Sequence, residues 1–167
     1  MTTPLAFLRQ DTPPYGVTQQ VAPLVRRITC RNPGPMTCDG TGTFIVGQGQ
    51  VAVIDPGPED EAHLAALLEA VRGETVTHIV VTHTHRDHSP LSRALKAATG
   101  APIVGCTPHR TPPAEGGEGA DQAHAPDQAM AEGDTITGPG WALRAVETPG
   151  HTANHLCFAF PEGDMVF

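Results

Sequence analysis

The sequence has few aromatic residues, few charged residues and no long hydrophobic run. Aromatic residues make up 4% and charged residues 17% of its 167 residues. Its longest apolar runs extend over only a few residues, too short for a membrane-spanning helix. The opening residues, MTTPLAFLRQDTPP, lack a basic segment followed by an apolar one, so we expect no signal peptide. These absences predict a cytoplasmic protein that does not associate with a membrane.

Cysteine and net positive charge are also scarce. The four cysteines are widely spaced, at Cys30, Cys38, Cys106 and Cys157. They include no CxxC pair, so we expect free thiols rather than a disulfide scaffold. The net charge of −8 argues against a general nucleic-acid or anionic-membrane binder. Four arginines against Asp11 nevertheless give residues 1–31 a charge of +3, which leaves −11 elsewhere and allows a basic patch near the N-terminus.

Glycine and proline are abundant, at 18 and 17 residues, which is typical of a loop-rich domain. Short β-like runs are expected at 20–27, 43–46, 51–55, 78–81, 102–105, 141–146, 155–160 and 165–167. One helix is expected within 58–73, and a second opens at Ser89 as N-cap, with Pro90 in its first turn, and ends at Gly100. A long loop follows over 107–130. This alternation of strands and helices predicts an α/β fold.

The strongest functional signal is the stretch Thr82-His83-Thr84-His85-Arg86-Asp87-His88. Two of its histidines stand two residues apart at the end of an expected strand, so their side chains can point the same way. Asp87 and His88 follow where the strand gives way to a helix, and they can face the same cleft. The alternative is a polar turn with surface histidines. A metal site explains the cluster better, because imidazole and carboxylate groups are ligands for zinc, iron and manganese.

This stretch resembles the HxHxDH signature of the metallo-β-lactamase fold. Two further segments are similar to family turns, Ile54-Asp55-Pro56-Gly57 and Thr148-Pro149-Gly150-His151-Thr152. Asn32-Pro33-Gly34-Pro35-Met36-Thr37, followed by Gly40-Thr41-Gly42-Thr43-Phe44, resembles the lactamase-like subgroup that includes animal mitochondrial endoribonucleases. The resemblance runs from about Val21 to Phe167. It implies an αββα sandwich of two mixed sheets with helices outside and metal ions at one edge.

The resemblance also implies roles for individual residues. The first metal ion would be bound by His83, His85 and His151. The second would take Asp87 and His88, and Asp87 would also act catalytically by orienting a water molecule or accepting its proton. Asp55 would orient ligands without touching metal. One or two divalent ions are implied, with zinc favoured and iron or manganese as alternatives.

The other histidines have less context. His155 is either a supporting residue near the metal or a packed strand residue. The remaining four are expected in structural or surface roles, at His63, His78, His109 and His124.

The family pattern ends later than this sequence does. A bridging Asp and a last ligand His are expected to be absent, and Asp164 is predicted to be a turn residue. We therefore expect residues 1–167 to be the N-terminal portion of a metallo-β-lactamase-like domain whose C-terminal part is missing. A homodimer or a complementing C-terminal chain would then cover its exposed apolar face.

The predicted function is a metal-dependent hydrolase that uses an activated water on an ester, thioester or phosphodiester. The alternative is a non-catalytic fragment that binds metal without turnover. The substrate is a small molecule or RNA. The subgroup resemblance points to RNA, and a thioesterase of the glyoxalase II type is the main rival.

Overall fold

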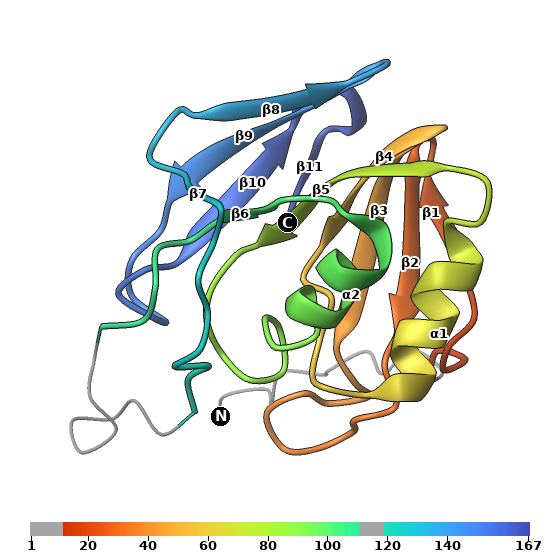
Figure 1. The fold of residues 1–167 in the computed structure, drawn as a ribbon, viewed down its shortest axis with the longest axis horizontal. Coiled ribbons are helices and arrows are strands. Elements are labelled where there is room, and N and C mark those ends of the chain that lie inside the picture. The colour runs from red at the N-terminus through yellow and green to blue at the C-terminus, as the bar shows by residue number, and fades with distance from the viewer. Residues whose placement is uncertain (1–11, 111–118) are drawn as a thin grey trace, which may run out of the picture.

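The computed structural model describes residues 12–110 and 119–167 and contains two β-sheets (Figure 1). The larger sheet has seven strands in sequence order, β1 (Gln19–Ala22), β2 (Val25–Thr29), β3 (Gly42–Gln48), β4 (Gln50–Ile54), β5 (Thr75–Val81), β6 (Ile103–Gly105) and β7 (Gln128–Ala129). The pairs from β1 to β4 are antiparallel, and those from β4 to β7 are parallel. The sheet is therefore mixed, as expected.

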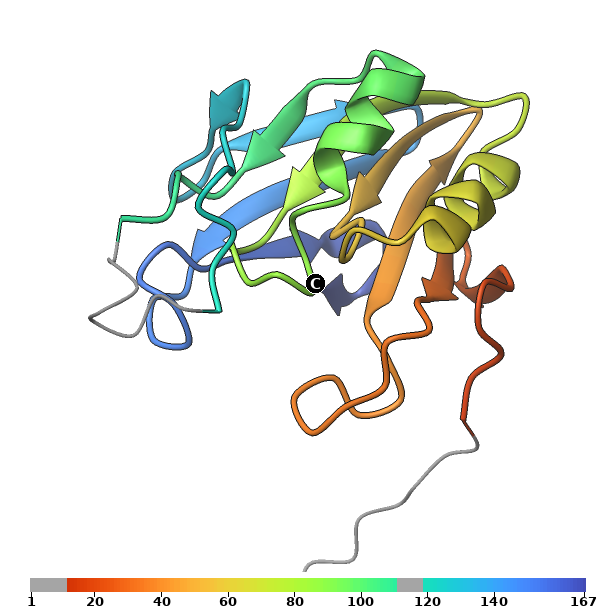
Figure 2. The same ribbon diagram turned by 60° about the horizontal axis from the view of Figure 1, so that its bottom comes forward.

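The second sheet is antiparallel in the part of the chain that the structure describes. Its strands lie in the order β11-β10-β9-β8, with β8 (Thr135–Gly138), β9 (Trp141–Glu147), β10 (Leu156–Phe160) and β11 (Met165–Val166). It lies against one face of the larger sheet, and the helices α1 (Glu61–Ala70) and α2 (Ser92–Thr99) cover the other (Figure 2). The expectation of two mixed sheets is thus wrong for the second sheet in the described residues, because its consecutive strands pair antiparallel and are joined by short connections rather than crossover helices.

The two sheets meet over an aliphatic core. Residues 51–54 of β4 and 79–81 of β5 are almost fully buried, because helices cover one face of these strands and the second sheet covers the other. Trp141 of β9 packs at the opposite end of the interface from the strand ends that lead into the histidine-rich loop, and its indole Nε1 donates to the Gln50 carbonyl at 3.0 Å. The core thus rests on aliphatic side chains with few aromatics, as the composition predicts.

The expected strand at 20–27 is two strands. β1 and β2 form a hairpin whose turn lies at Pro23 and Leu24, and Leu24 adopts a φ of +63°. Proline has no N–H to donate to a ladder, so it interrupts the run at this point. Apolar patterning alone missed this turn. It also missed the short strands β7 and β8.

The helices follow the predicted pattern except at one end. Asp60 is the N-cap of α1, and its Oδ1 accepts a hydrogen bond from the His63 N–H at 2.8 Å. α2 ends at Gly100, whose φ of +76° stops the helix as predicted. The prediction of Ser89 as the N-cap of α2 is wrong, because the helix begins at Ser92. The Ser89 hydroxyl instead donates to the Asp121 carboxylate at 2.9 Å.

The parallel strands place the functional loops. β4, β5 and β6 run in the same direction, so their carboxyl ends lie along one edge of the sheet. Asp55 follows β4 and Thr82 follows β5, which brings both to this edge. The long loop expected at 107–130 falls partly outside the described residues, at 111–118. Within its described part, Asp121 and His124 are buried. No described helix has the length and apolar character needed to cross a membrane.

Candidate metal centre

The turn after β4 and the loop after β5 form the base of the site. Asp55 adopts a φ of +48°, which turns the chain sharply and directs its carboxylate toward the β5 loop. Gly57 then donates its N–H to the His88 carbonyl and accepts from Leu91. Gly57 itself has a φ of +102°, a conformation that favours glycine. These bonds hold the two loops against each other.

Three histidines from distant parts of the chain converge at this edge. One ligand nitrogen from each of His83, His85 and His151 lies within 4.8 Å of the other two. His83 is buried, His85 is half-buried and His151 is exposed. The structure thus brings together the three residues predicted to bind the first metal ion, although 63 positions separate His88 from His151 in the sequence.

A second group of possible ligands consists of Asp55, His83 and His88, whose ligand atoms also lie within 4.8 Å of one another. The His88 Nδ1 is 2.9 Å from Asp55 Oδ2. The sequence predicts Asp55 as an orienting residue that does not touch metal. The structure places its carboxylate among atoms that could bind an ion directly.

Two other residues lie close to these groups. The Asp87 carboxylate is 3.3 Å from His88 Nε2, but Asp87 belongs to neither group of converging ligand atoms among the described residues. His155 precedes β10, and its ring centroid is 4.9 Å from that of His83. Its Nδ1 is 2.8 Å from the Thr148 hydroxyl. His155 therefore lies in the site rather than packed within the strand.

Thr82, which the sequence reasoning did not single out, orients His83. The Thr82 hydroxyl donates to Asp55 Oδ2 at 2.7 Å, and its backbone N–H donates to Oδ1 at 2.9 Å. Because the single hydroxyl proton is used in this way, the Thr82 oxygen accepts from the Nδ1–H of His83 at 2.9 Å. The lone pair of His83 then lies on Nε2, the nitrogen that faces His85 at 3.1 Å. A threonine directly before the signature is the signal that could have identified this role.

The histidine pKa values differ across the site. Burial lowers the pKa of His83 to about 3, with a further contribution from the neighbouring His88. Burial and the nearby His151 lower the pKa of His85, and burial also lowers that of His155. These imidazoles are therefore neutral at physiological pH, and neutral imidazole is the form that binds metal.

His88 behaves differently because carboxylates flank it. Burial disfavours its charged form, but hydrogen bonds to Asp55 and Asp87 outweigh burial and raise the pKa of His88 to about 10. Burial alone would raise the pKa of Asp55, but its hydrogen bond with His88 leaves this pKa below the usual range. The pKa of Asp87 is lowered, mainly by the same histidine. Without metal, His88 is thus a cation held between two carboxylates.

The residues fit a divalent metal ion. The donor set contains only imidazole nitrogens and carboxylate oxygens, which zinc, iron and manganese all accept. His83 has its lone pair directed at the cluster, and the Thr82–Asp55 chain behind it is the kind of supporting contact that fixes a metal-binding imidazole. Four other imidazole rings surround the site within a few ångströms of one another. Crowded imidazoles beside carboxylates indicate a metal centre.

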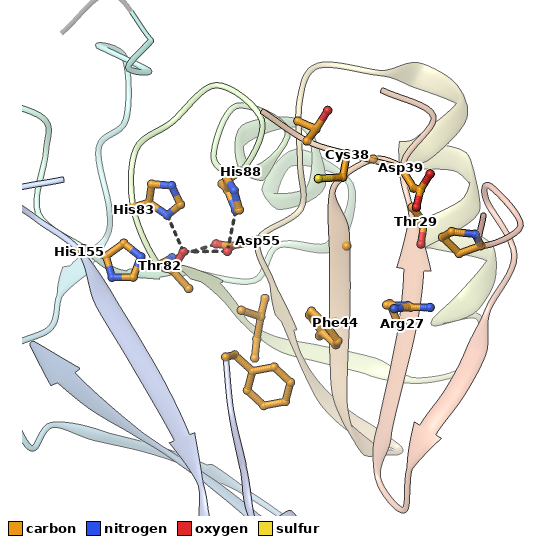
Figure 3. Close-up of a pocket in the computed structure, with 16 residues that line it drawn as sticks. Arg27, Thr29, Cys38, Asp39, Phe44, Asp55, Thr82, His83, His88 and His155 are labelled. Carbon is orange, nitrogen blue, oxygen red and sulfur yellow. Dashed lines mark hydrogen bonds and ion pairs between the residues drawn. The ribbon is translucent and has the colours of Figure 1, made fainter. Parts of the chain in front are cut away.

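Beside the histidines lies a pocket of about 540 Å³ (Figure 3). Asp55, Thr82, His83, His88 and His155 line one end of it. β2, β3 and the loop between them form most of the remaining wall, at Arg27, Thr29, Thr37, Cys38, Asp39, Gly40, Gly42 and Phe44. Pro13, Ile54 of β4 and Phe167 complete it. The candidate metal centre therefore opens onto a cavity large enough for a small-molecule substrate.

The histidines outside the site have structural contacts. His63 is buried beneath β3, where its Nε2 lies 2.9 Å from the Thr43 hydroxyl. His124 is buried against Cys106, with 3.5 Å between Nε2 and Sγ. His109 lies 2.9 Å from the Thr84 hydroxyl behind the signature loop. These contacts agree with the structural roles expected from the sequence.

The segment at 119–121 holds the signature loop from outside the pocket. The Asp121 N–H donates to the Thr84 carbonyl at 2.6 Å, and the Arg86 N–H donates to the Gly119 carbonyl at 3.0 Å. The buried Asp121 carboxylate also accepts from Ser89 at 2.9 Å and from Arg93 at 2.6 Å. One carboxylate thus ties the far end of the loop to α2.

We expect Asp121→Asn to weaken zinc binding about tenfold, because outer contacts that orient metal ligands contribute on this scale. Competition with a chromogenic chelator measures the affinity. Glu59→Gln is the matched control, since Glu59 also pairs with Arg93 but does not contact the loop. Equal losses in both variants would show that Arg93, and not the loop, accounts for the effect.

The structure can be compared with known proteins. Residues 36–167 match the family described as the metallo-beta-lactamase superfamily. The chain is 30% identical over 163 residues to an atrochrysone carboxyl ACP thioesterase of Pseudocercospora fijiensis, which covers 95% of this chain and 45% of that protein. It is 37% identical over 123 residues to a hydroxyacylglutathione hydrolase of Cereibacter sphaeroides, and this match covers 72% of this chain and 42% of that protein.

A subclass B3 metallo-beta-lactamase of Bradyrhizobium japonicum shares the fold, with a TM-score of 0.67 and 22% identity over 93% of this chain and 61% of that one. The chain spans about half the length of the curated relatives it matches. These similarities do not distinguish the endoribonuclease-type subgroup. The family match and the shared fold agree with the α/β class, and the chain belongs to the metallo-β-lactamase superfamily.

Proposed function

We propose that this chain carries the metal centre of a metal-dependent hydrolase whose substrate is a thioester. The observation that carries the proposal is the convergence of His83, His85 and His151, with ligand atoms within 4.8 Å of one another, beside a pocket of about 540 Å³ that His83 also lines. Two relatives support the thioester class by name, one an ACP thioesterase and the other a hydroxyacylglutathione hydrolase. The net charge of −8 favours a small thioester over RNA as the substrate.

In this proposal His83, His85 and His151 hold one divalent ion, with zinc favoured over iron and manganese. Asp87 and His88 contribute to a second ion, and Asp55 lies near enough to join them. The chemistry that a bound ion supplies is a lowered water pKa and a polarised carbonyl. Asp87 holds a carboxylate at the edge of the site that can orient a water or accept its proton.

Zinc removal tests the proposal. We expect the zinc-loaded chain to hydrolyse acyl thioesters. A chelator is expected to lower the hydrolysis rate more than about a hundredfold, because a metal ion stabilises the transition state by several kcal/mol. Added zinc restores the rate. Hydrolysis is followed with a thiol-reactive dye, and phosphodiester and lactam substrates are run in parallel.

The alternative is a metal-binding fragment without turnover. It predicts the same zinc content but no hydrolysis of any substrate in the panel. Robust phosphodiester cleavage without thioester cleavage would instead favour the endoribonuclease-type activity that the sequence resemblance implies.

A further inference from the structure

Arg27 lies on the pocket wall at a distance from the histidines. In β2 it pairs directly with Phe44 of β3, and Phe44 pairs with Ile54 of β4. Residues directly opposite each other in antiparallel strands share a face, so these three side chains form one row across the sheet. Two strand spacings separate the ends of the row, a span of about 10 Å. Asp55 of the candidate metal centre follows Ile54, so the row leads from that centre to Arg27 (Figure 3).

The neighbouring Arg26 shows that the two arginines have different roles. Arg26 lies on the opposite face, where it donates to the Ala70 carbonyl and pairs with Glu74 at 2.6 Å. Arg27 donates to the Gln19 side-chain carbonyl at 3.0 Å, but no carboxylate of residues 12–110 and 119–167 pairs with it. Its buried Nε has no partner in this part of the chain. Among the described residues, Arg27 is thus an arginine on the pocket wall without an acidic partner.

The surface between Arg27 and the histidines is apolar. Phe44 and Ile54 lie in the row itself, and the ring of Phe167 lies 5.1 Å from that of Phe44. Together these side chains form a hydrophobic floor between a cationic end and the candidate metal centre. Such an arrangement suits a ligand with an apolar body and an anionic end.

We propose that the pocket binds an acyl group whose distal end carries a carboxylate, and that Arg27 recognises this carboxylate. The inference names the substrate class of the proposed thioesterase and rests on that function. The apolar body lies over Phe44 and Ile54, and the thioester carbonyl lies at the histidine end. A carboxylate fits better than a phosphate, because the wall offers one guanidinium and also contains Asp39, which would repel a second negative charge.

Binding to the metal-free chain tests the recognition directly. The probes are monomethyl suberate, which carries one carboxylate on a chain that matches the span, and neutral dimethyl suberate. Calorimetry is expected to show about tenfold tighter binding of the acid to the wild type, as for a charged hydrogen-bonded pair. Arg27→Gln removes this preference, Arg27→Lys retains part of it, and the control Arg26→Gln retains it fully. Circular dichroism confirms that each variant is folded.

Turnover gives the second test, with the zinc-loaded chain. Two suberate monothioesters are compared, one with its distal carboxylate methylated and one with that carboxylate free. We expect Arg27→Gln to raise the KM of the free-acid thioester about tenfold without changing its kcat. The KM of the methyl-ester thioester is expected to stay the same. An unchanged preference for the acid in Arg27→Gln overturns the inference in either test. If the zinc-loaded wild type does not hydrolyse the thioesters but the acid still binds in a way that depends on Arg27, the proposed function is overturned and the carboxylate site stands.

Discussion

The His83→Ala variant is expected to lose zinc affinity by more than about a hundredfold. His83 is the residue that both groups of converging ligand atoms share, so its removal breaks both at once. Even supporting residues around a metal ion contribute 10–100-fold to affinity, so the loss of a ligand exceeds that range. Zinc per chain after dialysis is measured by plasma mass spectrometry, and affinity by chelator competition.

Two comparisons make this result specific. His85→Ala removes a residue of one group only, and we expect it to leave weaker but measurable zinc binding. His78→Gln is the control, because His78 lies in β5 with its ring against Trp141, at 6.3 Å between centroids and away from the site. Full zinc content in His83→Ala would contradict the proposed centre. Equal loss in His78→Gln would indicate general destabilisation instead.

The second large effect concerns stability. We expect Asp55→Ala to lower the free energy of unfolding of the metal-free chain by about 3–5 kcal/mol, the range for removing one partner of a buried ion pair. Asp55 is 7% exposed and accepts hydrogen bonds from Thr82 N–H, Thr82 Oγ1 and His88. Its removal leaves buried donors unpaired, and alanine is also strained at a φ of +48°. Urea unfolding measures the change.

Asp55→Asn keeps the side-chain shape and tolerates the backbone conformation, so it is expected to lose less stability than Asp55→Ala. Glu69→Gln is the surface control, because Glu69 also belongs to an ion pair, with Arg72, but is 61% exposed. Exposed pairs contribute little, so its free energy of unfolding is expected to change by less than about 1 kcal/mol. A loss in Asp55→Ala no larger than in Glu69→Gln would show that the Asp55 contacts do not hold the two loops together.

Local features were predicted from the sequence where neighbouring residues decide them. The helix expected within 58–73 is α1, and Gly100 marked the end of α2. One error arose where a tertiary contact competes with a local signal. Ser89 has the chemistry of an N-cap, but Asp121, 32 residues later in the chain, takes its hydroxyl. The other error has a local cause, because Pro23 has no N–H to donate and the expected strand at 20–27 turns at Pro23 and Leu24.

The sequence by itself determined the chemistry of the site. The spacing of His83, His85, Asp87 and His88 places imidazole and carboxylate groups within a few residues, and short spacing alone keeps them close in any fold. Tertiary structure decided the rest. His151 reaches His83 because the start of β10 bonds to the end of β5, where the Leu156 N–H donates to the Thr82 carbonyl at 2.9 Å.

The same holds for Asp55 and Arg27. Asp55 becomes a neighbour of His88 because parallel β4 and β5 end at one edge of the sheet. Arg27 faces the pocket while Arg26 faces α1, because successive side chains of a strand point to opposite faces. Which face becomes a pocket wall depends on strand pairing and on packing between distant segments. The sequence pattern does not contain that information.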